Sequence, residues 1–354
     1  MPGVRQDIAV EASGGVDDGA HARRAARLAA GWGPIRNHKD RILPVSISRE
    51  RDPLLWWHCD AVLIGGGRLA RVVCVHGVGQ QQRGAKQLLK EWIPALRDGI
   101  AAAEAPGVLA DGDVAMAFYG GRFLPPGQVL SPDDPYLSAA DVGTEWEREL
   151  LYAWWAAAAA EEPQVGAPDA VGTLAGTPVS VQAGLLALSQ SRFFAGLAEK
   201  ALVFDLKQVR RYFTDPELRS AAREQAAALI GPDTRVVVGH SLGSIVAYEA
   251  LCALPGHGVR ALVTLGSPLG IPNLIFDRLD PAPTAGQGRW PGGPGLAWTN
   301  VADRRDVVAL VKDLRPAFGP EAACHLVPNG SHAHDATHYL GKQATGAAIA
   351  QALQ

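Results

Sequence analysis

The sequence predicts an α/β fold, with a mostly parallel central sheet flanked by helices and a large helical insertion. In the second half of the chain, short apolar runs rich in Val and Leu alternate with segments of helical pattern. Strands that are apolar on both faces and separated by helices are typical of parallel sheets covered on both sides. With 354 residues, 47% of them hydrophobic, the chain is long enough to bury a core of this kind.

The predicted domain occupies residues 56–354. Residues 1–55 are rich in Arg, Asp, Gly and Ala and show no strand pattern, so we expect an N-terminal arm or tail that is partly disordered. The domain begins with an expected hairpin, because residues 58–64 and 69–76 have strand patterns on either side of three glycines.

A long helical insertion interrupts the alternation of strands and helices. After an expected helix at 86–104 and an expected strand at 112–121, the next clear strand is roughly a hundred residues away. The intervening segment, from about 122 to 215, is mostly helical in pattern and includes the apolar, Trp-containing run 150–160. A segment of this length is too long for a loop, so we expect a helical cap over one edge of the sheet.

Beyond the cap, the expected elements alternate as a parallel sheet requires. They are a helix at 216–231, a strand at 235–238, a helix at 245–254, strands at 260–265, 296–301 and 323–327, and a final helix at 335–353.

The composition excludes several classes of partner. The net charge is −3 and the pI is about 6.4, so the chain lacks the basic field that nucleic-acid binding requires. The four cysteines form no C-x-x-C pair, the first residues lack a signal-like apolar segment, and no apolar run is long and uncharged enough to span a bilayer. We therefore expect a cytoplasmic protein with no integral membrane segment.

A serine at a sharp corner is the strongest functional signal. The stretch RVVVGHSLGSIVAYEAL places Gly239-His240-Ser241-Leu242-Gly243 between an expected strand and an expected helix. Small residues on both sides of the serine allow the backbone to turn tightly, which lifts the hydroxyl above the sheet. The G-x-S-x-G spacing alone is common, and its strand–helix context is what indicates a nucleophile at Ser241.

A serine nucleophile needs a histidine base and usually a carboxylate behind it, and after this type of turn the acid and then the base follow in sequence. Asp303 and Asp306 both lie just beyond the expected strand 296–301. We prefer Asp306 because an apolar segment follows it directly and would hold the carboxylate in place. Asp303 remains the alternative acid, whereas Asp277 and Asp280 come too early in the chain.

Three histidines before the last expected helix, His332, His334 and His338, are candidates for the base. Asp335 is the expected N-cap of that helix, which leaves His334 on the loop and His338 in the first helical turn. We expect His334 to be the base, with His338 as the alternative. The cluster lacks a zinc-binding spacing, so no metal is expected, and His325, within an expected strand, is interpreted as a packing histidine.

A glycine-rich turn closes the first apolar strand, with the sequence Val75-His76-Gly77-Val78-Gly79-Gln80. Acyl transfer requires paired donors for the oxyanion that forms on the substrate carbonyl. We expect the amide of Leu242 to be one donor and that of Val78, or alternatively Gly79, to be the other. His76 would then support the loop.

Several of these segments together resemble the α/β-hydrolase superfamily, and within it the lipase- and esterase-like serine hydrolases. The resemblance runs from about residue 70 to the C-terminus and rests on VVCVHGVGQ, VVVGHSLGSIVAYEAL, LVTLGSPLG, WTNVADRRDVVAL and HAHDATHYL. It implies an α/β-hydrolase fold with Ser241 as nucleophile, Asp306 as triad acid, His334 as base, and no cofactor. The helical insertion has no counterpart in it.

The expected activity is hydrolysis of a carboxylic ester through an acyl-enzyme, and the apolar insertion favours a small hydrophobic ester as substrate. A thioesterase, an amidase or a serine peptidase would use the same triad. The non-catalytic alternative is a hydrolase fold that acts as an interaction protein. Asp205, within the insertion, is expected to be a surface or capping residue, with cleft lining as its alternative role.

Overall fold

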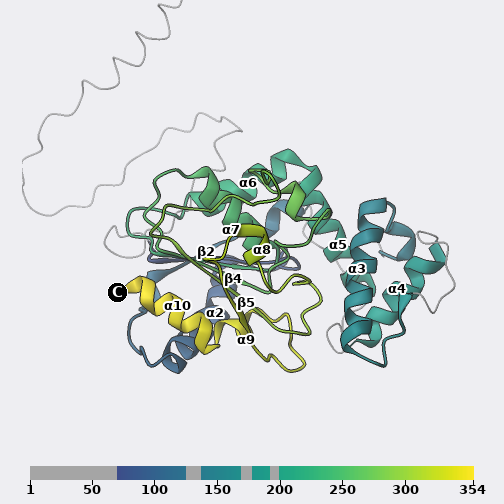
Figure 1. Cartoon of the computed structure of the whole chain (residues 1–354), viewed down its shortest axis with the longest axis horizontal. Helices are drawn as coiled ribbons and strands as arrows, with labels where there is room; N and C mark the ends of the chain where they lie inside the picture. Colours follow the sequence, from purple (N-terminus) through teal and green to yellow (C-terminus); the bar gives the residue numbers. More distant parts are fainter. Residues whose placement is uncertain (1–69, 125–136, 169–177, 192–198) are drawn as a thin grey trace, which may run out of the picture. The chain divides into compact units, whose positions relative to one another are not determined.

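Six parallel strands form one sheet at the centre of the fold, in the order β2-β1-β3-β4-β5-β6 (Figure 1). The structure, a computed structural model, describes residues 70–124, 137–168, 178–191 and 199–354. The strands are β1 (Val72–Val75), β2 (Val114–Ala117), β3 (Val236–His240), β4 (Ala261–Leu265), β5 (Ala297–Ala302) and β6 (Ala323–Leu326). The predicted parallel sheet is therefore confirmed, as an α/β architecture.

Most positions of the central strands β1, β3 and β4 are apolar because both faces of the sheet are covered. Alternate residues of β1 and β3 pack in two separate cores: Val72 and Val236 belong to one, and Val73 and Val237 to the other. This explains why the valine runs show no alternation with polar residues.

Helices cover both faces of the sheet (Figure 1). On one side α2 (Ala85–Ala102) packs against α9 (Ala336–Leu340) and α10 (Gln343–Leu353). On the other side α7 (Leu242–Ala253) lies against β3, and α6 (Pro216–Ala227) packs on α7. Helix α2 connects β1 to β2 and α7 connects β3 to β4, as parallel pairing of these strands requires.

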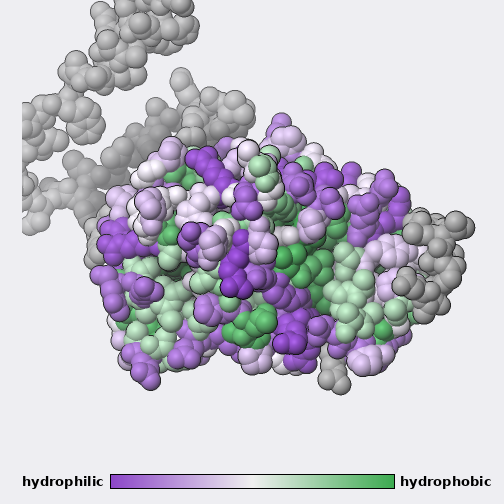
Figure 2. Space-filling model, viewed as in Figure 1, coloured by the Kyte–Doolittle hydropathy of each residue, from purple (hydrophilic) through white to green (hydrophobic). Residues whose placement is uncertain are grey.

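Three helices make up the described part of the predicted cap: α3 (Glu145–Glu161), α4 (Pro178–Gln190) and α5 (Glu199–Thr214). Thr144 caps α3, its side chain accepting from the Glu147 N–H at 3.2 Å. Trp154 and Trp155 of α3 are buried in the core that also contains α7. Figure 2 shows apolar residues gathered where α3 lies, among polar ones on this face.

Several expected elements differ from the structure or fall outside it. Residues 1–55 and the expected strand 58–64 lie outside the described residues. The expected helix 335–353 is two helices, because the chain turns at Gly341 and Lys342 so that α10 can pack closely on α2. His325 is exposed and is not a packing residue, because β6 is the edge strand and carries mostly exposed side chains.

None of the helices in the described ranges is long and apolar enough to cross a bilayer. The run 181–206, apolar but interrupted by charges, is divided between α4 and α5 where it is described. Among the described cysteines, Cys74, Cys252 and Cys324 are free thiols.

A buried carboxylate ties three helices together. Glu249 of α7 is fully buried and forms an ion pair with Arg219 of α6, whose Nε also donates to Oε2 at 3.0 Å. The Tyr212 hydroxyl of α5 donates to Oε2 at 2.6 Å, and the Asp280 N–H donates to Oε1 at 3.0 Å. Each carboxylate oxygen of Glu249 thus accepts two hydrogen bonds. The one from Tyr212 links α5 to α7.

Replacing Glu249 by Ala should lower the free energy of unfolding by about 3 kcal/mol, because Arg219 and Tyr212 lose a buried partner. Urea denaturation measures the change. Asp111→Ala is the matched control: it breaks an ion pair with Arg97 in which both side chains are exposed, and should change the free energy of unfolding by less than about 1 kcal/mol. Equal effects of the two changes would contradict the role given to Glu249.

Candidate active site

Ser241 occupies a strained corner between β3 and α7. Its φ of 53° and ψ of −128° lie in a region that side-chain-bearing residues seldom adopt. The flanking glycines permit this corner: a Cβ at Gly239 would lie 2.6 Å from the Ser244 Cα, and one at Gly243 would lie 2.3 Å from the Val75 carbonyl oxygen. Both positions of the G-x-S-x-G motif therefore require glycine, because backbone atoms of neighbouring segments occupy the space that a Cβ would need.

Asp306 lies on the loop after β5, fully buried. Its Oδ2 accepts from His334 Nδ1 at 2.8 Å and from the Tyr339 hydroxyl at 2.7 Å, and its Oδ1 accepts from the N–H groups of Val308 at 2.9 Å and Ala309 at 3.1 Å. Burial by itself raises the pKa of Asp306, but His334 and these hydrogen bonds outweigh burial and hold the pKa below its usual value. The carboxylate is thus ionised behind the imidazole.

His334 lies on the loop between β6 and α9, which matches its predicted loop position. Its hydrogen bond to Asp306 assigns the proton of the neutral ring to Nδ1, so that Nε2 is the acceptor. His240, the residue before Ser241, holds the same loop: its Nε2 donates to the His334 carbonyl at 2.8 Å, and the two ring centroids are 4.7 Å apart. The pattern around Ser241 pointed to the serine and gave no signal for His240.

Gly266, which directly follows β4, allows Asp306 and His334 to approach each other. Its φ is 53°, and a Cβ at this position would lie 2.7 Å from Asp306 Oδ2 and 3.0 Å from His334 Nδ1. Any larger residue would therefore separate the pair or move it. The Gly-Ser-Pro of the TLGSPLG segment begins with this glycine.

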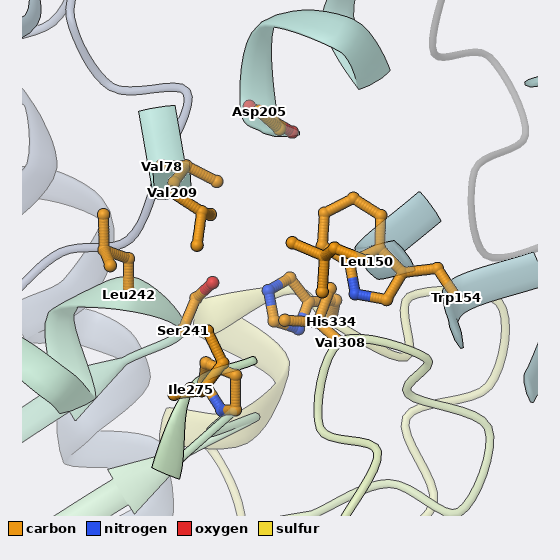
Figure 3. Close-up of a pocket in the computed structure, with 11 residues that line it drawn as sticks. Val78, Leu150, Trp154, Asp205, Val209, Ser241, Leu242, Ile275, Val308 and His334 are labelled. Atoms are coloured by element: carbon orange, nitrogen blue, oxygen red, sulfur yellow. The ribbon is translucent and has the colours of Figure 1, made fainter. Parts of the chain in front are cut away.

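Ser241 and His334 line one cavity of about 110 Å³ (Figure 3). Apolar side chains from the sheet loops and from the cap form most of its wall; they include Val78, Leu150, Trp154, Val209, Ile275 and Val308. Figure 3 shows the serine hydroxyl and the imidazole directed into this space. A second cavity of about 220 Å³, lined in part by Arg83, Glu91 and Trp92, also borders Ser241 and His334.

The predicted oxyanion loop is held by His76, as expected. Its buried ring accepts at Nε2 from the N–H groups of Tyr119 at 3.1 Å and Gly120 at 3.2 Å, while Nδ1 donates to the Gly77 carbonyl at 2.7 Å. Burial lowers the pKa of His76 to about 4, so the ring is neutral near pH 7.

The expected oxyanion donors, Val78 and Leu242, lie beside Ser241, whereas the alternative donor Gly79 has another partner. Val78 and Leu242 both line the cavity beside Ser241, and the Leu242 N–H begins α7, where it has no partner within the helix. The alternative donor, Gly79, is unsuitable because its N–H donates to Gln208 Oε1 at 3.0 Å.

The alternative acid and base lie elsewhere. Asp303 is buried, and its carboxylate accepts from the backbone N–H groups of Arg305 and Asn329, so that it shapes the loop instead of meeting His334. His338 is exposed and lies 3.3 Å from the Asp335 carboxylate, which caps α9 as predicted.

A surface cluster was not expected from the sequence. The ligand atoms of His332, Asp335 and His338, all exposed, lie within 4.8 Å of one another, close enough to share a cation. Of these residues only Asp335 borders a cavity that Ser241 lines.

The predicted surface or capping role of Asp205 is wrong. We expected a surface or capping role, yet its carboxyl lines both cavities beside Ser241, facing the serine and His334 from α5 (Figure 3). Burial raises the pKa of Asp205 to about 7, with His334 opposing the rise. Its position depends on how α5 lies over α7, for which the sequence carries no local signal.

Comparisons with protein families, with curated proteins and with solved structures found no match to this chain.

Acid should destabilise the protein because two buried histidines resist protonation in the folded state. Burial lowers the pKa of His76 to about 4 and that of His240 to about 3, from an ordinary 6.5. As the pH falls below 6.5, protons therefore bind the unfolded chain first. Between about pH 6.5 and about pH 5, each histidine should lower the free energy of unfolding by on the order of 1.5 kcal/mol.

Urea denaturation of wild type and His76→Gln at both pH values measures this effect. The fall in the free energy of unfolding between the two pH values should be about 1.5 kcal/mol smaller in the variant than in the wild type, whatever its stability at the higher pH. An unchanged pH dependence in the variant would show that His76 is not the neutral, buried group described.

Proposed function

We propose that the chain is a serine hydrolase of the α/β-hydrolase type that cleaves carboxylic esters through a Ser241-His334-Asp306 triad. One observation carries the proposal: Asp306 orients an imidazole that lines the same cavity as a serine on a strained strand–helix corner. The order Ser, Asp, His along the chain and the glycine-rich loop after β1 add support.

In the first half of the reaction the Ser241 Oγ forms a bond to the ester carbonyl carbon. His334 Nε2 takes the hydroxyl proton, and the electron pair of the C=O bond moves to the oxygen. The tetrahedral intermediate then collapses, the bond to the alcohol oxygen breaks, and the imidazolium returns its proton to that oxygen. An acyl group remains on Ser241.

In the second half, water replaces the alcohol. His334 takes a proton from the attacking water, the tetrahedral oxyanion forms again, and its collapse returns the proton to Ser241 and releases the acid. Asp306, ionised and hydrogen-bonded to Nδ1, stabilises the positive charge that His334 carries in both halves.

The N–H groups of Leu242 and Val78 serve as donors to the oxyanion. The Leu242 amide lies at the N-terminus of α7, where the helix dipole favours negative charge. The hydrogen bonds of His76 hold the loop that carries Val78, so little reorganisation is needed when charge develops.

The two cavities beside Ser241 bind different parts of the ester, the acyl chain in one and the alcohol portion in the other. The apolar cavity of about 110 Å³ is the smaller of the two, and its apolar wall suits a short acyl chain. The larger cavity, with Arg83 and Glu91 in its wall, suits a polar alcohol portion.

Hydrolysis of p-nitrophenyl butyrate tests the assignment of the triad. Ser241→Ala and His334→Ala should each lower kcat/KM by about 1,000-fold or more, because the triad members act as a unit. His338→Ala should retain activity within about 2-fold, since its exposed ring lies away from Asp306. Loss of activity in His338→Ala with retention in His334→Ala would overturn the choice of base.

A series of p-nitrophenyl esters tests the size of the acyl site. kcat/KM should be greatest near four acyl carbons and fall by at least about 10-fold at twelve, because the longer chain does not fit the apolar cavity. A rate that rises steadily with chain length would contradict this assignment of the cavity.

Thioesters and amides would react by the same two steps, because the triad acts on the carbonyl and the cavity walls choose the leaving group. Among the described residues, nothing favours these substrates, a peptide or a purely structural role over a short ester.

A further inference from the structure

Asp205 is an ionisable group in the wall of a mostly apolar cavity. Among the described residues that line the apolar cavity, the polar side chains are those of Ser241, His334 and Asp205, apart from the indole of Trp154. Ser241 and His334 have roles in the chemistry, whereas Asp205 has none in the two-step reaction. A carboxyl group in such a wall therefore indicates that part of the substrate binds to it.

The described residues do not supply a cationic partner for Asp205. Among the described residues no Lys or Arg forms an ion pair with Asp205, and the one charge that acts on its carboxyl is that of His334. Gln208, one turn along α5, is already engaged with the Gly79 N–H at 3.0 Å and with Gln81 at 2.9 Å. Burial without a cation keeps the pKa of Asp205 near 7, and a cationic partner would stabilise the carboxylate.

Asp205 also stands at the junction of the two cavities. It borders both of them, together with Val78, Ser241 and His334. A Cβ built at Gly79 of the oxyanion loop would lie 3.6 Å from its Oδ1. A group attached a few bonds from the ester carbonyl would therefore reach this carboxyl while the carbonyl lies at Ser241.

We propose that Asp205 determines substrate specificity by binding an ammonium group, so that the preferred substrates are esters of short acids with amino-bearing alcohols. The inference rests on the proposed function of Ser241. An ammonium N–H donates to the carboxylate and neutralises it in a site of low dielectric, where such a hydrogen bond is stronger than in water. An uncharged group of the same shape leaves the carboxyl without a partner, and an anionic group meets repulsion.

A matched pair of esters tests this proposal. The substrates are 2-(dimethylamino)ethyl butyrate, protonated near neutral pH, and 3-methylbutyl butyrate, its uncharged isostere, with p-nitrophenyl butyrate as a measure of basal activity. The wild type should prefer the ammonium ester by about 10-fold or more in kcat/KM.

Asp205→Asn keeps the shape of the side chain and removes its charge. The variant should lose most of the preference, to about 2-fold or less, measured as the ratio of kcat/KM on the ammonium ester to kcat/KM on the uncharged ester. The control Asp98→Asn removes the same charge from the exposed face of α2 and should keep the preference. Because the variant relieves an unpaired carboxyl, its melting temperature should equal or exceed that of the wild type.

The outcomes separate the two proposals. Hydrolysis of p-nitrophenyl butyrate without a preference for the ammonium ester would overturn the role of Asp205 and leave the triad standing. A preference that persists in Asp205→Asn would do the same, because another group would then bind the cation. A wild type inactive on all three esters would overturn the proposed function and this inference with it.

Discussion

The site depends on how closely α7 packs on the carbonyl ends of the central strands. At Gly243 the helix backbone lies so near the β1 carbonyls that a Cβ would be 2.3 Å from the oxygen of Val75. This close packing holds Ser241 at a positive φ, a conformation that persists only where the surroundings impose it. The same packing brings the first turn of α7 beside the loop after β1, so the proposed nucleophile and the proposed oxyanion donors depend on one constraint.

Asp306 and His334 reach this corner because all the strands are parallel, so that the loops after β3, β5 and β6 meet at one edge of the sheet. Contacts between loops then fix the geometry. Tyr339 of α9 donates to Asp306 and accepts from the Asp303 N–H, and His240 holds the backbone of His334. Glu249, at the far end of α7, joins the cap to this frame through α5. The cap wall and Ser241 are therefore parts of one packed unit.

The sequence predicted the parts of the site that have local patterns. Apolar runs indicated the inner strands, and the glycines around Ser241 indicated the corner, because both features follow from periodicity and backbone space. The choice of Asp306 and His334 rested on chain order and loop position, and these two side chains are hydrogen-bonded in the structure. Asp205 and His240 could not be assigned in this way, because their roles depend on which distant segments they face. The break in the final helix was missed for a similar reason: contacts with α2 decide where α10 begins.

A fluorophosphonate probe tests the central claim most directly, because it forms a covalent adduct only with a serine activated by a base. Peptide mapping by mass spectrometry after labelling of the folded wild type should find a single adduct, on Ser241, and labelling should fail in Asp306→Ala, where His334 loses its partner. A folded wild type that remains unlabelled, or an adduct on another serine, would contradict the claim that this corner presents an activated nucleophile.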